Sequence, residues 1–221
     1  EADWQVGRDA EAFLNAIAAY IRLSAQSLVD TMGKQVLKKL INSTMNLDKE
    51  ELAKGAATMM GLSAALAPKL SASQRSVLYR AIGPCLEDAR HAAVQKRAYR
   101  VLAIMCESHS KAAAAEDFEW LETVAKAIVG GMSTSSVAGK RQRLVCMGHI
   151  VRGLDLTNEQ HQQLFLESLG EIVLCLKDQN TRARQAAFDC LFIMSQQMEK
   201  QGMLTTFFDM VCAGLAGKTP H

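Results

Sequence analysis

The stretch Val94–Cys106, VQKRAYRVLAIMC, carries a pattern that returns downstream. The stretch 183–195, ARQAAFDCLFIMS, matches it at an offset of 89 positions, so that Phe188 takes the place of Tyr99. Both stretches then place a leucine, an isoleucine and a methionine at the same spacing after that aromatic residue. The chain therefore contains an internal repeat.

A third copy lies midway between the first two. The stretch 140–150, KRQRLVCMGHI, puts Leu144 in the same place, 45 positions after Tyr99 and 44 before Phe188. A period near 45 residues is long enough for two helices and is the signature of HEAT or armadillo-type solenoids. We expect Tyr99, Leu144 and Phe188 to face one shared interior.

The composition also favours helices. The chain has 221 residues, of which 49% are hydrophobic but only 5% aromatic, with three prolines and no long alternation typical of a strand. We predict an all-α, HEAT/armadillo-like, right-handed α-solenoid of about ten helices in antiparallel pairs. The expected helices cover about 10–23, 27–41, 47–67, 73–86, 91–108, 115–129, 137–153, 157–178, 181–200 and 203–215.

No domain boundary interrupts this pattern. We expect residues 1–221 to form a single solenoid segment, with less regular helices in 1–70, three clear helix pairs in 73–200 and the start of a further pair in 203–216. The chain begins at Glu1 without a methionine or a leader, so we interpret it as a piece of a longer protein.

Several function classes are disfavoured. No nucleotide-binding, metalloprotease or nucleophile motif is present, and the six cysteines form no C-x-x-C pair, so they are expected to be reduced core thiols of an intracellular protein. His149 lies in an apolar stretch and is expected to be packed. We predict no enzyme activity, cofactor, metal, membrane span or small-molecule substrate. The net charge of +2 neither requires nor excludes a polyanion as partner.

The positive candidate is a set of cations near the start of the second helix of each repeat. Alignment of the repeats puts Gln95, Lys140 and Arg184 in one column and Lys96, Arg141 and Gln185 in the next. Equivalent positions lie side by side in a solenoid, so these cations would form a stripe able to follow a phosphate backbone. The candidate nucleic-acid or partner-binding residues are Lys96, Arg97, Arg100, Lys140, Arg141, Arg143, Arg182 and Arg184.

A structural alternative stands beside this hypothesis. HEAT repeats typically pair an aspartate in the turn within a repeat with an arginine early in the second helix. Asp178 and Arg184 fit that pattern, and Asp88 occupies the matching turn although Gln95 replaces its arginine. We favour the structural role for Arg184. For the three cations at 140, 141 and 143, which have no acidic neighbour, we favour a surface contact.

Three collinear blocks lie between Ser73 and Met198. They are QKRAYRVL at 95–102 with Cys106; the 133–136 loop with KRQRL at 140–144 and HIVR at 149–152; and EIVLCLK at 171–177 with Ala187-Phe188. Together these blocks resemble the ribosomal RNA-processing protein twelve family. Before Ser73 the chain resembles that family only in being helical.

The resemblance implies a karyopherin-like, non-enzymatic scaffold of the nucleus and nucleolus that shuttles to the cytoplasm. Its implied partners are pre-ribosomal particles, ribosomal RNA and assembly factors in rRNA processing and nuclear export of subunits, and also the Ran GTPase and nuclear-pore proteins. An alternative is a transport module whose slots between helices take peptides, pore repeats or a small GTPase. A third is a HEAT subunit of an unrelated cytoplasmic assembly.

Overall fold

The computed structural model describes residues 8–111, 118–131 and 134–217, and all regular structure in these ranges is helical. Ten α-helices occur there, with short 3-10 turns before α4 and α5. The helices are α1 Arg8–Leu23, α2 Gln26–Thr44, α3 Glu50–Leu66, α4 Ala72–Glu87, α5 Ala92–Lys111, α6 Phe118–Val129, α7 Val137–Gly153, α8 Glu159–Cys175, α9 Thr181–Lys200 and α10 Leu204–Ala216. The prediction of an all-α fold is confirmed.

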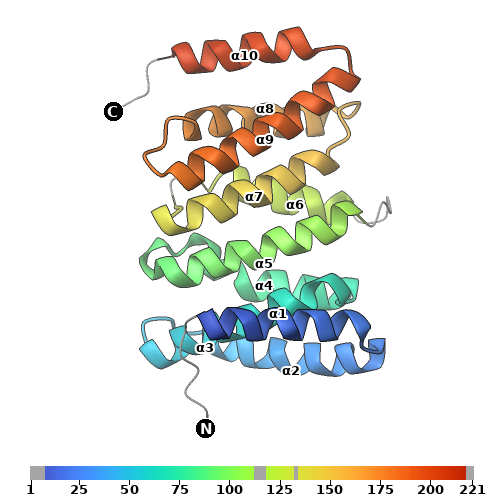
Figure 1. Cartoon of the computed structure of the whole chain (residues 1–221), viewed down its shortest axis with the longest axis vertical. Helices are drawn as coiled ribbons and strands as arrows, with labels where there is room; N and C mark the ends of the chain where they lie inside the picture. Colours follow the sequence, from blue (N-terminus) through green and yellow to red (C-terminus); the bar gives the residue numbers. More distant parts are fainter. Residues whose placement is uncertain (1–7, 112–117, 132–133, 218–221) are drawn as a thin grey trace.

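The helices form two layers that run along the long axis of the molecule (Figure 1). In one layer α1, α3, α5, α7 and α9 follow one another, each in contact with the next. In the other layer α2 contacts α4, and α8 contacts both α6 and α10. The pairs α2–α3, α4–α5, α6–α7 and α8–α9 join the layers, which gives a HEAT/armadillo-like α-solenoid.

The starts of α7 and α9, near which several predicted cations lie, are fixed by capping side chains. Ser136 accepts a hydrogen bond from the backbone N–H of Gly139 at 3.1 Å. Asn180 accepts from the backbone N–H groups of Arg182 at 2.9 Å and Ala183 at 3.4 Å. These caps satisfy N–H groups that have no partner within the helix, and they set the register of the residues that follow.

The repeat residues occupy equivalent positions, but they are not equally covered. Tyr99 is 2% exposed and Leu144 is 1% exposed, as predicted, whereas Phe188 is 55% exposed, so the prediction of a buried Phe188 is wrong. The Tyr99 hydroxyl donates to the Leu86 carbonyl at 3.2 Å and lies 3.5 Å from the Ser135 hydroxyl, at the start of the next repeat. Phe188 lacks such a neighbour because α9 is the last helix of its layer in the described ranges.

Candidate functional site

The predicted cationic columns lie at the N-terminal ends of α5, α7 and α9, the second helices of three successive pairs. Gln95 is the α5 residue of the first column, and its side chain is fully buried. Its side-chain amide donates to the carbonyls of Leu86 at 2.9 Å and Thr134 at 2.8 Å, and its oxygen accepts from the backbone N–H of Ser136 at 2.8 Å. Gln95 therefore ties its own helix pair to the turn that starts α7.

Lys140 makes the same kind of link one repeat further along. Its Nζ donates to the Asp178 carboxylate at 2.6 Å, in the turn between α8 and α9. Burial by itself would raise the pKa of Asp178, but the hydrogen bonds from Lys140 and from the backbone N–H of Asn180 outweigh it and lower that pKa. The ammonium group of Lys140 is therefore already paired with a partly buried carboxylate.

Arg184, the third member of this column, binds the turn that precedes its own helix. Its Nη1 donates to the carbonyls of Asp178 at 2.7 Å and Gln179 at 3.1 Å, and its Nη2 donates to the Thr181 hydroxyl at 3.2 Å. These contacts support the structural alternative for Arg184. The Asp178 carboxylate itself is bound by Lys140, so the aspartate serves two cations from neighbouring repeats.

Arg143 was predicted to be a surface contact, and this prediction is wrong because the residue is only 1% exposed. Its guanidinium forms an ion pair with Glu171 on α8 and donates to the carbonyls of Ile128 and Val129 at the end of α6. Burial lowers the pKa of Arg143. Arg143 follows Arg141 by about 200° of helical rotation, so only one of the two can face solvent.

Two cations on α5 also have partners in the fold. Arg97 is half-buried, and its Nη1 donates to the Ala57 carbonyl of α3 at 2.9 Å. Burial, followed by the neighbouring charge of Arg100, lowers the pKa of Arg97. Arg100 lies 3.9 Å from the Glu11 carboxylate of α1, and both side chains are well exposed. That contact is weak because solvent screens it.

The cations that stay available form what we call the basic stripe: Lys96, Arg100, Arg141 and Arg182. Lys96, Arg141 and Arg182 are exposed, and within residues 8–111, 118–131 and 134–217 no ion pair or hydrogen bond of their side chains is found. Lys96 and Arg141 hold equivalent positions on the adjacent helices α5 and α7, and Arg182 stands at the start of α9. The structure therefore places these charges near the N-terminal ends of α5, α7 and α9, along one edge of the layer that these helices form with α1 and α3.

Other chemistry is limited in the described part of the chain. No group of three or more His, Cys, Asp or Glu residues there is placed to hold a metal ion. Five cysteines are buried as predicted, but Cys212 is exposed. Burial raises the pKa of Cys85 to about 11 and that of Cys190 to about 12, so both thiols are protonated at neutral pH. None of the described helices combines the length and the apolar character that crossing a membrane requires.

Sequence reasoning missed the role of Glu171. A signal was present, because Glu171 is the only charged residue in the apolar run 169–176, LGEIVLCL. A carboxylate in such a run needs a buried cation as partner. No spacing rule paired Glu171 with Arg143, since the two lie 28 positions apart along the chain, on different helices.

Stacked helix pairs of this kind define a HEAT/armadillo-like α-solenoid, a class of fold that presents an extended surface. The chain is 30% identical over 211 residues to an "RRP12-like protein" of Homo sapiens, which covers 93% of this chain and 16% of that protein. The "RRP12-like protein" of Gallus gallus is 26% identical over 222 residues, or 98% of this chain and 16% of that protein. The "Ribosomal RNA-processing protein 12" of Saccharomyces cerevisiae is 25% identical over 234 residues, which cover 94% of this chain and 19% of that protein.

All three similar proteins are named for ribosomal RNA-processing protein 12, and this chain resembles them along nearly its whole length. It spans 16 to 19% of the length of these curated relatives. The similarity covers 93 to 98% of this chain, so it extends well before Ser73, where the sequence resembled the family only in being helical. No protein-family model matches the chain.

Proposed function

We propose that this chain is part of a non-enzymatic scaffold in ribosome biogenesis, which holds pre-ribosomal particles in the nucleus and nucleolus during rRNA processing. The similarity to RRP12-like proteins over 93% of the chain carries the proposal. The name of the yeast relative refers to ribosomal RNA processing. A solenoid suits such a role because its surface grows with each repeat and its core does not depend on a bound ligand.

The basic stripe is the part of this segment that we propose to contact RNA. Neighbouring helices in a layer are about 8–10 Å apart, so exposed cations on α5, α7 and α9 recur at intervals that a nucleic-acid backbone can follow. Each phosphate that is neutralised releases bound counterions, which makes binding strongly salt-dependent. This proposal does not include Lys140, Arg143 or Arg184, because their charged groups already bind partners within the fold.

The stripe is tested with fluorescently labelled single-stranded and hairpin RNA. The variant Lys96→Glu/Arg141→Glu/Arg182→Glu reverses three exposed charges without touching the core. We expect it to bind RNA on the order of tenfold or more weakly, with a smaller dependence on salt, because up to about three phosphate contacts are lost.

The matched control reverses three exposed cations at the opposite ends of helices in the same layer, Arg22, Arg152 and Lys200. It has the same net charge as the stripe variant, so general repulsion of RNA would weaken both equally. Equal affinities of the two variants would contradict an RNA contact at the stripe, whereas a selective loss in the stripe variant would support it.

We also propose that the full-length protein takes part in nuclear export of subunits and contacts a small GTPase or nuclear-pore repeats. Such protein contacts need slots between neighbouring helices that accept apolar side chains. A hollow between α2 and α4, lined by Leu37, Ile41 and Val77 among others, supports a peptide-binding role in addition to RNA contact.

A further inference from the structure

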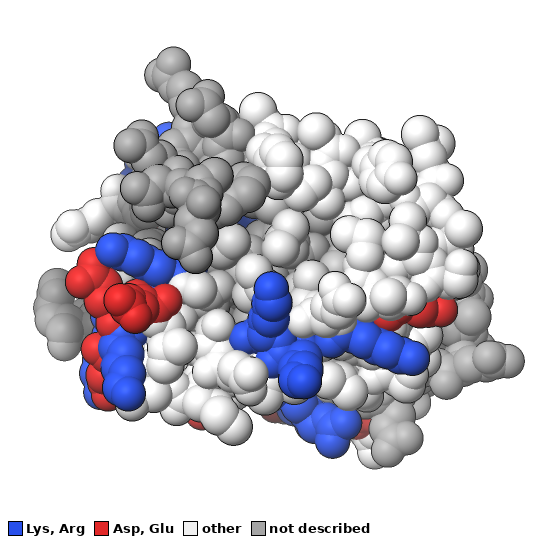
Figure 2. Space-filling model, turned by 90° about the horizontal axis from the view of Figure 1, so that it is seen from below, with Lys and Arg blue, Asp and Glu red and all other residues white. Residues whose placement is uncertain are grey.

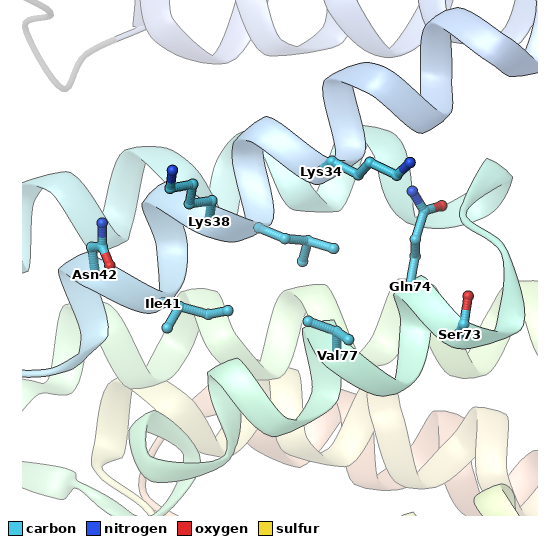
Figure 3. A pocket seen from close by; sticks show the side chains of 8 residues that line it. Lys34, Lys38, Ile41, Asn42, Ser73, Gln74 and Val77 are labelled. Atoms are coloured by element: carbon cyan, nitrogen blue, oxygen red, sulfur yellow. The ribbon is translucent and has the colours of Figure 1, made fainter.

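A groove runs between α2 and α4 in the layer opposite the basic stripe (Figure 3). One part of it encloses about 370 Å³ between Lys34 and Asn42 of α2 and the first turns of α4. A second part of about 440 Å³ continues towards Met45 and Pro84. Ile41 and Val77 line both parts, so the two hollows form one continuous groove.

The floor of this groove is apolar. Leu37, Ile41 and Val77 line the first part. In the second part, Ala81 and Pro84 join Ile41 and Val77. Figure 3 shows Ile41 of α2 and Val77 of α4 between the two helices, with Lys34 and Lys38 along the α2 side. Ile41 is 36% exposed, so part of its side chain is open to an apolar ligand.

The rim of the groove is cationic and lacks acidic residues. No Asp or Glu occurs in 31–47 or in 67–86, the parts of the chain that form both walls. The exposed side chains of Lys34, Lys38 and Arg80 have no ion pair or hydrogen bond in the ranges that the structure describes. Seen from the α2 end of the stack, one group of Lys and Arg side chains lies in the lower middle of the view, whereas a second group at the left edge lies among acidic side chains (Figure 2).

The shape of the groove fits a helix. Its α2 wall extends from Lys34 to Met45, which corresponds to about 16 Å along a helix axis, or about three turns. An amphipathic helix lying in a groove places apolar residues at i, i+3, i+4 and i+7 on the floor. Acidic residues on its flanks would then meet Lys34, Lys38 and Arg80 at the rim.

We propose that the groove between α2 and α4 binds an acidic amphipathic helix of a partner protein. This inference deepens the peptide-binding part of the proposed function and does not depend on the basic stripe. RNA fits the groove less well, because none of the described residues that line it has an aromatic side chain to stack on a base. A phosphate backbone would also leave the apolar floor uncovered.

The proposal is tested by selecting binders of the 221-residue chain from a displayed library of helical 16-residue peptides that vary in charge and in apolar spacing. We expect the enriched peptides to combine helically spaced apolar residues with Asp or Glu. The exposed-site variant Lys34→Glu/Lys38→Glu should weaken their binding on the order of tenfold, and Ile41→Gln should weaken it as well.

The control Arg22→Glu/Arg152→Glu makes the same change in net charge and should leave peptide binding within about twofold. Lys34→Gln/Lys38→Gln should give a smaller loss than charge reversal. The proposal is overturned if no peptide is enriched, if the enriched peptides lack acidic residues, or if Lys34→Glu/Lys38→Glu binds them unchanged. It is also overturned if Lys34→Glu/Lys38→Glu binds labelled RNA more weakly than the parent while no acidic peptide binds the parent. The basic stripe is tested separately, by the variant Lys96→Glu/Arg141→Glu/Arg182→Glu.

Discussion

Arg143 of α7 and Glu171 of α8 form an ion pair inside the protein, with side chains that are only 2% and 6% exposed. The pair joins two successive repeats, and Arg143 also binds the last carbonyls of α6. A buried pair of this kind is costly to break, because the remaining partner keeps a charge without a counterion. Its role is therefore to hold adjacent repeats in register.

Arg143→Met should destabilise the chain by about 3–5 kcal/mol, because Glu171 is left buried and unpaired. Urea unfolding followed by circular dichroism measures this change. The double variant Arg143→Met/Glu171→Leu should recover most of the loss, since neither charge remains. Arg141→Met, an exposed control, should stay within about 0.5 kcal/mol of the parent. Equal effects of Arg141→Met and Arg143→Met would contradict the buried pair.

Gln95→Leu should cost about 2–4 kcal/mol, because it leaves the carbonyls of Leu86 and Thr134 and the N–H of Ser136 without their partner. Gln185 of α9 belongs to the neighbouring column, and its exposed amide donates to the Asp189 carboxylate at 3.0 Å. Gln185→Leu should therefore change the free energy of unfolding by less than about 0.5 kcal/mol. A small effect at position 95 in the same unfolding experiment would show that the tie between repeats is not needed.

The Lys140–Asp178 link should show a pH-dependent coupling. A double-mutant cycle with Lys140→Met and Asp178→Asn should give about 1 kcal/mol at pH 7. The pKa of Asp178 is lowered in the folded protein, so the carboxylate stabilises the fold above its unfolded pKa of about 4, and this contribution is lost as the pH falls through the lower folded value. A coupling that is the same at pH 7 and well below the folded pKa would argue against an ionic link.

Two residues at equivalent repeat positions should respond differently to truncation. Tyr99→Ala removes a buried ring and two hydroxyl contacts and should cost about 3–5 kcal/mol. Phe188→Ala removes a ring that is more than half exposed and should cost less than about 1 kcal/mol in this chain. Thermal or urea unfolding of both variants compares them directly, and similar losses would show that Phe188 is covered in solution.

The repeat pattern was sufficient to predict the helices and the interior positions of Tyr99 and Leu144. It could not predict the exposure of Phe188, because burial depends on a neighbouring helix of the same layer and not on the residue's own helix. Periodicity alone gives the face of a helix, while coverage of that face comes from tertiary packing.

The candidate site was harder to predict, because the positions of cations in the aligned repeats do not show which side chains face solvent. Arg143 lies one and two turns before Met147 and Ile150, on the buried stripe of α7, and this spacing was a usable signal. The pairing of Lys140 with Asp178 joins residues 38 positions apart and needs the fold to be known. Of the eight cations predicted from the sequence, the four of the basic stripe remain as candidates for contact with RNA.

A role in ribosome biogenesis is tested by purifying the full-length protein from its own cells and sequencing the RNA that comes with it. Precursor ribosomal RNA and ribosome-assembly proteins should co-purify with the parent protein, and the RNA should be reduced in Lys96→Glu/Arg141→Glu/Arg182→Glu but not in Arg22→Glu/Arg152→Glu/Lys200→Glu. Absence of precursor ribosomal RNA and assembly proteins from the parent sample would contradict a role in ribosome biogenesis.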